Sequence, residues 1–158
     1  KVENATSMYP GRLVKRGTTD AQILVGTAGC KPVGFLGFEQ AHPKFKPKDA
    51  NGNPSITAAY AVNAEAPVLN GPVIWVARAT GAAIVKGDAL VAAADGKVTK
   101  AAALSVTVPS GGTNVTSDAA QPNLVEAGSD LPGGPIVAHA EEDQDASGSD
   151  KDIIVRSD

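Results

Sequence analysis

The residues that could do chemistry are few and lie far apart in this chain of 158 residues. There are two histidines, His42 in a lysine- and proline-rich stretch and His139 within an apolar run, and one cysteine, Cys30. A structural zinc site needs four ligands at short, regular spacings, and an isolated thiol forms no disulfide within the chain. These residues therefore predict no metal centre, and Cys30 is expected to be structural rather than nucleophilic.

Sequence motifs for covalent or phosphate chemistry are also missing. No serine stands in a Gly-x-Ser-x-Gly elbow, and no glycine-rich stretch has the Gly-x-x-x-x-Gly-Lys-Ser/Thr spacing of a phosphate-binding loop. A covalent mechanism needs a nucleophile with an activating base beside it. We predict no catalytic, cofactor-binding or metal-binding residues, no cofactor and no enzymatic activity.

A segment near the carboxyl end is the best candidate for a calcium loop. Asp143 to Ser149 places side-chain oxygens at alternate positions and Gly148 at the sixth, as the loop of an EF-hand does. The twelfth position, where an EF-hand needs a bidentate glutamate, is Ile154, and the flanking residues have the pattern of strands. A calcium-dependent module stays open as an alternative to a solvated acidic turn between two strands.

One lysine-glycine turn raises a second alternative. Ile84 to Leu90 resembles the entry turn of lipoyl and biotinyl domains, which are small β-sandwiches with a modified lysine on an exposed hairpin. The hairpin sequence that follows, Asp95-Gly96-Lys97-Val98, is not the motif in which that lysine is modified. A lipoyl- or biotinyl-like interaction or carrier module is the alternative function. The simpler interpretation is that Lys-Gly-Asp turns the chain and leaves its charges in water.

The composition excludes several classes of partner. The formal net charge is -3, aromatic residues make up only 4%, and the basic residues are scattered apart from Lys44, Lys46 and Lys48. Nucleic-acid binding needs a concentrated basic surface, with aromatic residues where single strands are bound, so we expect no nucleic-acid partner. No apolar run approaches the roughly 20 residues that span a bilayer, so no membrane partner is expected either.

Short strands separated by turn residues predict an all-β fold, a small β-barrel or sandwich with long loops and an extended N-terminal arm. Asp95-Gly96 is a hairpin signal. Val73 to Ala77 is apolar on both faces, which predicts a strand covered on both sides with Trp75 as its largest buried residue. The other expected strands are Arg12 to Lys15, Gln22 to Val25, Pro32 to Phe38, Ala58 to Val62, Ala66 to Leu69, Ile84 to Ala92, Lys97 to Thr99, Leu104 to Val108, Asn123 to Ala127, Pro135 to Glu141 and Asp152 to Arg156.

The expected organisation is an N-terminal arm over residues 1–10 and a single β-barrel domain over residues 11–158. Long loops without regular structure are expected near 40–54 and 109–122, where proline, glycine and polar residues gather. Loops of this length in a compact domain tend to be functional or mobile. Small Ala and Gly side chains favour thin layers that pack against copies of the chain or against a larger surface.

Two distant parts of the chain repeat one pattern. The first part opens with Gly11 to Gly17 and later reaches Pro32 to Gln40; the second opens with Gly81 to Gly87 and later reaches Pro135 to Asp143. In each, an apolar pair leads into Lys and a Gly turn, and a proline-led apolar run ends in carboxylates or an amide. Such a repeat predicts a β-scaffold made from related halves.

The order of these motifs resembles the small capsid decoration, or cement, proteins of tailed phages and related viruses. The motifs that carry the resemblance are Gly11 to Lys15, Gly81 to Val91, Asp95 to Val98, Pro135 to Glu142 and Ile153 to Arg156. The likeness covers most of the chain and is weakest over Gln40 to Asn70 and Pro109 to Pro122.

The resemblance implies a structural, non-enzymatic β-barrel that binds the outer surface of an icosahedral capsid and stabilises contacts between major capsid subunits. Its implied partners are the major capsid protein and further copies of itself, commonly in a homotrimer, and its implied location is the outer surface of the virion. In such proteins terminal arms and long loops often make the contacts with the capsid or with neighbouring copies. The residues expected to touch the capsid or a neighbour are Lys1, Val2, Met8, Tyr9, Lys44, Phe45 and Lys46.

Overall fold

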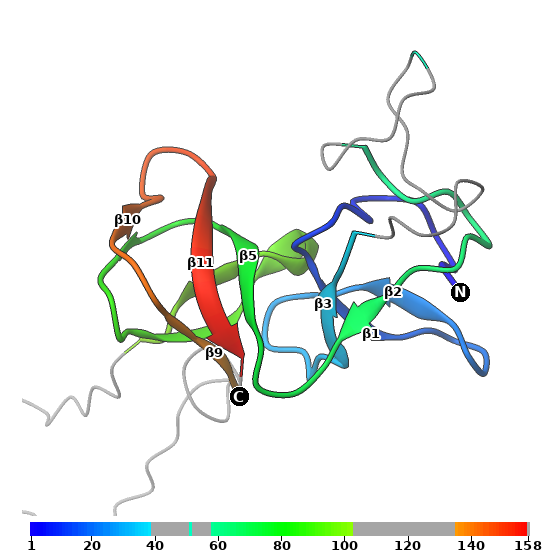
Figure 1. The fold of residues 1–158 in the computed structure, drawn as a ribbon, viewed down its shortest axis with the longest axis horizontal. Helices are drawn as coiled ribbons and strands as arrows, with labels where there is room; N and C mark the ends of the chain where they lie inside the picture. Colours follow the sequence, from blue (N-terminus) through cyan, green and yellow to red (C-terminus); the bar gives the residue numbers. More distant parts are fainter. Residues whose placement is uncertain (39–50, 52–57, 103–134, 158) are drawn as a thin grey trace, which may run out of the picture.

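The computed structural model describes residues 1–38, 51, 58–102 and 135–157, and Figure 1 shows their arrangement. Within these ranges the regular structure is β apart from one short 3-10 turn, η1 (Ala94–Gly96), so the all-β prediction is confirmed. No helix of the described ranges has the length and apolar character to cross a membrane. The strands are β1 (Leu13–Arg16), β2 (Ile23–Val25), β3 (Gly34–Leu36), β4 (Val68–Leu69), β5 (Ile74–Ala79), β6 (Ala83–Ile84), β7 (Ala89–Ala92), β8 (Val98–Lys100), β9 (Ile136–Ala140), β10 (Gln144–Asp145) and β11 (Lys151–Ser157).

Five strands close into a barrel in the order β11-β5-β8-β7-β9. β11 pairs antiparallel with β5 from Lys151, opposite Ala79, to Arg156, opposite Ile74. β5 meets β8 in parallel only where Ala79 lies opposite Val98. Most of this second edge of β5 therefore takes no part in the barrel ladder, and β10 pairs separately with β6 outside it.

A four-stranded antiparallel sheet in the order β2-β1-β3-β4 stands beside the barrel (Figure 1). Side chains alternate between the faces of a strand, and here both faces are covered. Leu13 and Phe35, which lie opposite each other, join the core of the barrel. Their neighbours Val14 and Leu36 enter a second core cluster on the far face. The sheet is therefore held between two cores.

The residues before β1 help to form this second cluster. Val2 and Met8 are fully buried in it, together with Tyr60. The Val2 amide donates to the carbonyl of Ala64 at 2.9 Å, and Val2 forms a parallel bridge to Ile23 at the edge of β2. Residues 1–10 contain no named strand, but backbone hydrogen bonds and buried side chains fix them against the sheet.

The hairpin expected at Asp95-Gly96 is confirmed and connects β7 to β8. Asp95 (φ 57°) and Gly96 (φ 66°) both have positive φ, the conformation that a two-residue type I′ turn requires. The tip of this hairpin packs on the sheet, since the Gly96 amide donates to the carbonyl of Gly26 at 2.8 Å. The turn thus also joins the barrel to the sheet.

Two of the predicted strands are wrong, one in part and one entirely. Ile84 to Ala92 is not continuous: β6 ends at Ile84, and a turn closed by the Asp88 amide donating to Val85 at 2.9 Å precedes β7. Ala58 to Val62 forms no strand, because Tyr60 instead turns its whole side chain into the second cluster, where its hydroxyl donates to the carbonyl of Gly37 at 2.9 Å.

The expectation that β5 is covered on both faces is also wrong. Ile74 and Val76 are 66% and 49% exposed, and Trp75 is only partly buried. The apolar residues on the outer face of β5 are paired with β11 but covered by no described element. Among the described residues, the largest fully buried side chains are Tyr60, Phe35 and Met8.

Several sequence predictions lie outside the described residues. These are the strands expected at Leu104 to Val108 and Asn123 to Ala127, the loop near 109–122, and the loop near 40–54 except for Asn51.

The repeated sequence pattern corresponds to two different pairings. In the first part, β1 pairs directly with β3. In the second, β6 pairs with β10, whereas β9 pairs with β7 and β11 inside the barrel. The first part of the repeat therefore lies within one open sheet, whereas the second places β6 outside the barrel and β9 inside it, so the described halves do not have the same topology.

Candidate functional site

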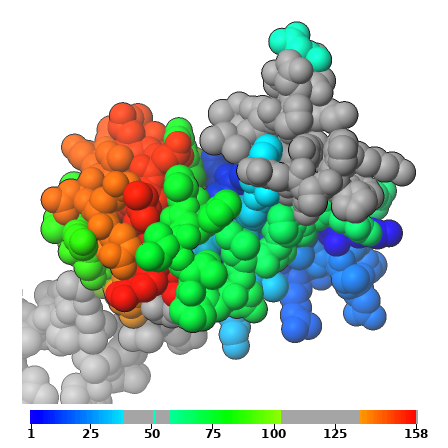
Figure 2. All heavy atoms as spheres, viewed as in Figure 1, coloured from blue at the N-terminus to red at the C-terminus, as the bar shows by residue number. Residues whose placement is uncertain are grey.

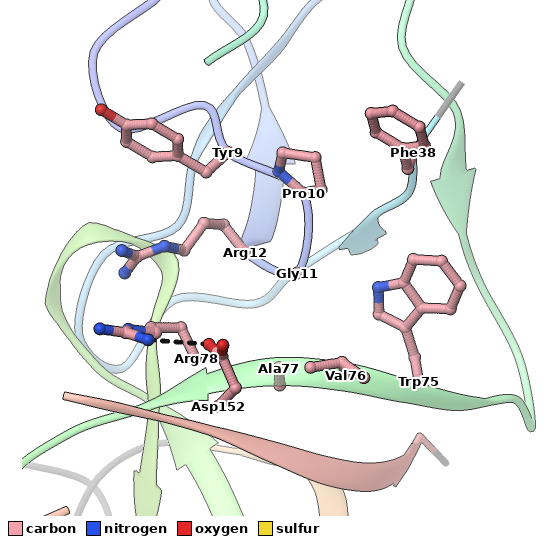
Figure 3. Close-up of a pocket in the computed structure, with 10 residues that line it drawn as sticks. All are labelled: Tyr9, Pro10, Gly11, Arg12, Phe38, Trp75, Val76, Ala77, Arg78 and Asp152. Atoms are coloured by element: carbon pink, nitrogen blue, oxygen red, sulfur yellow. Dashed lines mark hydrogen bonds and ion pairs between the residues drawn. The ribbon is translucent and has the colours of Figure 1, made fainter. Parts of the chain in front are cut away.

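A groove of about 540 Å³ lies where the chain entering β1 meets the outer half of β5. Figure 2 shows β5 and its approach in the middle of one face of the molecule, between its N-terminal and C-terminal parts. Figure 3 shows the side chains around the groove. They are Tyr9, Pro10, Gly11, Arg12, Phe38, Trp75, Val76, Ala77, Arg78 and Asp152.

Gly11 sets how closely the two walls of the groove approach. Its φ is +83°, and a Cβ at this position would lie 2.7 Å from the main-chain oxygen of Val76. Its amide donates to the carbonyl of Leu36 at 2.7 Å, which fixes this residue to β3. Any other residue would be strained by both its conformation and this contact. The glycine therefore lets the segment before β1 lie against β5.

One end of the groove is aromatic and apolar. In Figure 3 the rings of Phe38 and Trp75 stand on the same side, and the indole nitrogen is on the side that faces Gly11. This nitrogen, Trp75 Nε1, is buried and has no hydrogen-bond partner among the described residues. A buried N–H donor without an acceptor costs about 1–3 kcal/mol. This end of the groove thus carries a donor that a bound acceptor would satisfy.

The other end of the groove is cationic. Arg78 forms an ion pair with Asp152, with Nη1 and Oδ1 2.9 Å apart. The Arg12 guanidinium lies 5.9 Å from the centre of the Tyr9 ring and donates to the carbonyl of Asp95 at 3.3 Å. Among the described residues Arg12 forms no ion pair with a carboxylate. Burial, followed by the charge of Arg78, lowers the pKa of Arg12 from its ordinary value.

An exposed apolar surface adjoins the groove on the outer face of β5 and β11. Val76 and Ile154 are direct cross-strand partners, 49% and 39% exposed, and Ile74 lies on the same face of β5. Charged pairs stand at either end of these residues, Arg78 with Asp152 and Arg156 with Glu141. An apolar centre with a charged rim is typical of protein-protein contact surfaces.

The residues predicted to make contacts do not gather in one place. Lys1 and Tyr9 are exposed, and Tyr9 borders the groove. Val2 and Met8 are fully buried in the second cluster, so in this fold they position their exposed neighbours rather than face a partner. Lys44, Phe45 and Lys46 lie outside the described residues, and their contacts stay a prediction.

The segment considered for calcium has other partners in the structure. Asp143 accepts a hydrogen bond from the Lys86 amide at 2.8 Å, and Asp145 accepts from both the amide and the hydroxyl of Ser147, which lowers the pKa of Asp145. In the described part of the chain no three or more His, Cys, Asp or Glu residues group together as metal ligands would. The carboxylates act here as turn-forming hydrogen-bond acceptors.

The hairpin lysine considered for a carrier module is also engaged. Lys97 Nζ lies 2.8 Å from the Asp150 carboxylate, and the lysine side chain is only 19% exposed. This ion pair between Lys97 and Asp150 connects the β7–β8 hairpin to the residue just before β11. This arrangement gives Lys97 a structural contact instead of the exposed position that a modified carrier lysine occupies.

Sequence reasoning named Tyr9 as a contact residue and expected Trp75 to be buried in a covered strand, and it missed Arg12, Phe38 and Arg78 as parts of a common site. Arg12 directly precedes β1, Phe38 follows the end of β3, and Arg78 lies near the end of β5. The useful signal was the apolar outer face of β5. The sequence pattern predicts a strand covered on both sides, whereas exposed apolar residues in a row point to a contact surface.

The comparisons with known proteins give one family. A family model described as "Structural cement protein (E217 gp24/Pam3 gp6)" matches residues 1–129. The match includes β1 to β8 and every lining residue of the groove except Asp152. No curated protein and no solved structure gives a significant match.

Proposed function

The chain belongs to the phage family of structural cement proteins, and on this premise we propose that it binds the outer surface of an icosahedral capsid and stabilises contacts between major capsid subunits. The family match over residues 1–129 is the observation that carries the proposal. A structural role in the virion follows from the family. The outer position and the subunit contacts are the proposed refinement.

The exposed face of β5 and β11 supports a role in binding a large partner. Ile74, Val76 and Ile154 expose apolar surface on paired strands, and a rigid strand pair loses little conformational entropy when it binds. A cement protein occupies many equivalent sites on a shell, so that modest contacts repeated by symmetry add up to strong attachment.

We further propose that the protein acts as a homotrimer. Closed symmetric assembly is the common state of soluble oligomers, and a trimer would bring three copies of each contact surface to the shell. The molar mass in solution, measured by light scattering after size exclusion, tests this part. A mass of one chain, or of any assembly other than three chains, would contradict it.

The exposed residues near the amino end remain candidates for contact. Lys1 and Tyr9 lie on a segment that Val2 and Met8 fix to the sheet. We propose that this segment presents a fixed surface to the capsid or to a neighbouring copy. The contacts expected of Lys44, Phe45 and Lys46 belong to the same proposal.

The function is tested with shells that lack the cement protein. Purified protein is mixed with these shells, and bound protein is measured by sedimentation together with the temperature at which the shells open. We expect saturable binding and a higher opening temperature. If the protein does not sediment with the shells, or if it binds without changing their heat resistance, the proposed function is wrong.

A further inference from the structure

We propose that the groove between the Tyr9–Arg12 segment and β5 binds an extended segment of the major capsid protein, with an apolar side chain against Phe38 and Trp75 and a carboxylate against Arg12. This inference rests on the proposed function, because it names the part of the capsid partner that the protein recognises. Three features of the groove support this proposal: its shape, the unsatisfied donor of Trp75 and the charge of Arg12.

The shape of the groove favours an extended peptide. Between Trp75 and Arg78 the strand advances about 10 Å, at about 3.3 Å per residue. An extended segment places the side chains of residues i and i+2 on one face, about 7 Å apart. Such a segment along β5 would bring one side chain to the aromatic end and the next but one to within about 3 Å of the cationic end, a distance that the long arginine side chains span. The expected pattern is therefore apolar, any residue, acidic.

The unsatisfied indole of Trp75 indicates what the aromatic end lacks. Within the described part of the chain Trp75 Nε1 is a buried donor without an acceptor, and its ring stands beside the groove with Phe38 (Figure 3). An extended peptide presents main-chain carbonyl oxygens at regular intervals. One carbonyl could accept from Nε1 while the adjoining apolar side chain covers the rings, which adds apolar burial to the hydrogen bond.

The charge of the groove selects an acidic partner. Two guanidinium groups, of Arg12 and Arg78, face one carboxylate, Asp152, which is paired with Arg78. The positive charge of Arg12 is thus left without an ion-pair partner among the described residues. Burial and the nearby charge of Arg78 lower the pKa of Arg12, and the charges of Asp150 and Asp95 offset only part of this effect. A carboxylate would relieve this repulsion and could accept two hydrogen bonds from the guanidinium. This positive site is local, since the chain as a whole has a formal charge of -3.

The test compares groove variants with a matched control on cement-free shells. Arg12→Gln removes the unpaired charge, and Trp75→Phe removes the N–H donor but keeps an aromatic ring. Arg16→Gln removes the same charge from an exposed position at the end of β1, away from the groove lining. Unfolding midpoints of all three variants are measured first, so that binding is compared between folded proteins.

We expect Arg12→Gln and Trp75→Phe each to weaken shell binding about tenfold per site, and Arg16→Gln to bind as the unchanged protein does. If the unchanged protein binds shells and the groove variants bind equally well, the groove proposal is wrong while the proposed function stands. If the unchanged protein does not bind at all, the proposed function fails first.

A photo-crosslinking amino acid at position 38 provides a second test that does not depend on weakened binding. The full protein carrying it is bound to shells, irradiated and digested, and the attached peptide is identified by mass spectrometry. A peptide of the major capsid protein with an acidic residue two positions after an apolar one supports the proposal. Attachment only to a second copy of this chain, or to a capsid peptide without that pattern, overturns it.

Discussion

The barrel and the four-stranded sheet achieve stability in different ways. The barrel core includes several small residues, among them Ala77, Ala79, Ala138 and Ala140, all almost fully buried. The far side of the sheet is covered by large residues that come from irregular segments, Met8 before β1 and Tyr60 before β4. The barrel strands form a closed ladder, whereas the far face of the sheet is kept from water by segments that form no strand.

This difference explains why the groove forms where it does. At the junction, the segment that completes the second cluster through Met8 continues into Tyr9 and Arg12 and then into β1. It meets β5 at the stretch that β8 leaves unpaired. The groove therefore belongs to both regions, and its geometry depends on the sheet staying packed.

Loss of the Tyr60 side chain should produce the largest effect. Tyr60→Ala removes a fully buried ring and its hydroxyl contact with Gly37, and we expect the free energy of unfolding to fall by about 4 kcal/mol. Amide hydrogen exchange should show a greater loss of protection in β1 to β3 than in β7, β9 and β11. Chemical denaturation and exchange measured by mass spectrometry check both parts.

Tyr60→Phe is the control for the hydroxyl, since it keeps the ring and should cost about 1–2 kcal/mol. Equal loss of protection in the barrel and the sheet after Tyr60→Ala would contradict the comparison, and would mean that the two cores unfold as one unit.

An overfilled barrel should have the next largest effect. Ala138 is fully buried in β9, so Ala138→Leu forces extra atoms into a packed interior and should lower the free energy of unfolding by about 2 kcal/mol. The loss of exchange protection should now be greatest in the barrel strands. Ala83→Leu makes the same change at an exposed strand position and should alter stability by less than about 0.5 kcal/mol. Similar losses from both variants would show that the barrel interior tolerates larger side chains.

The smallest expected effect is the loss of stability at acidic pH. Glu3 accepts hydrogen bonds from the amide and hydroxyl of Thr18, which lower its pKa, and the pKa of Asp88 is lowered by Lys100 and by the Val85 amide. A carboxyl whose pKa is lower in the folded state stabilises the fold above its unfolded pKa and loses that contribution as the pH falls through the folded pKa. We therefore expect stability to decline below about pH 4.

Urea denaturation across this pH range separates the two regions. Glu3→Gln should reduce the pH dependence that comes from the sheet, and Asp88→Asn the part that comes from the barrel. Asp20→Asn is the control, because Asp20 is exposed and its carboxylate forms no hydrogen bond or ion pair within the described residues. A pH profile unchanged by both Glu3→Gln and Asp88→Asn would show that these hydrogen bonds do not stabilise the fold.

The sequence was sufficient to predict local structure and not the arrangement of distant segments. Asp95-Gly96 identified its hairpin, because the positive φ that this turn needs is a property of those two residues. The burial of Val2, Met8 and Tyr60 could not be predicted in this way, since an isolated apolar residue in an irregular segment has no period. For Ile74 and Val76 the pattern was clear but the interpretation was wrong, because an apolar strand face can be covered by a partner as well as by the chain itself.

Trp75 has one more consequence, which is spectroscopic. It is the chain's one tryptophan, so light absorbed selectively by indole excites a single chromophore located at the edge of the groove. Indole emission moves to shorter wavelengths when water is replaced by apolar contacts. The purified protein therefore carries an intrinsic optical probe at its proposed recognition site, and titration with synthetic peptides of the expected apolar and acidic pattern can be followed without any label.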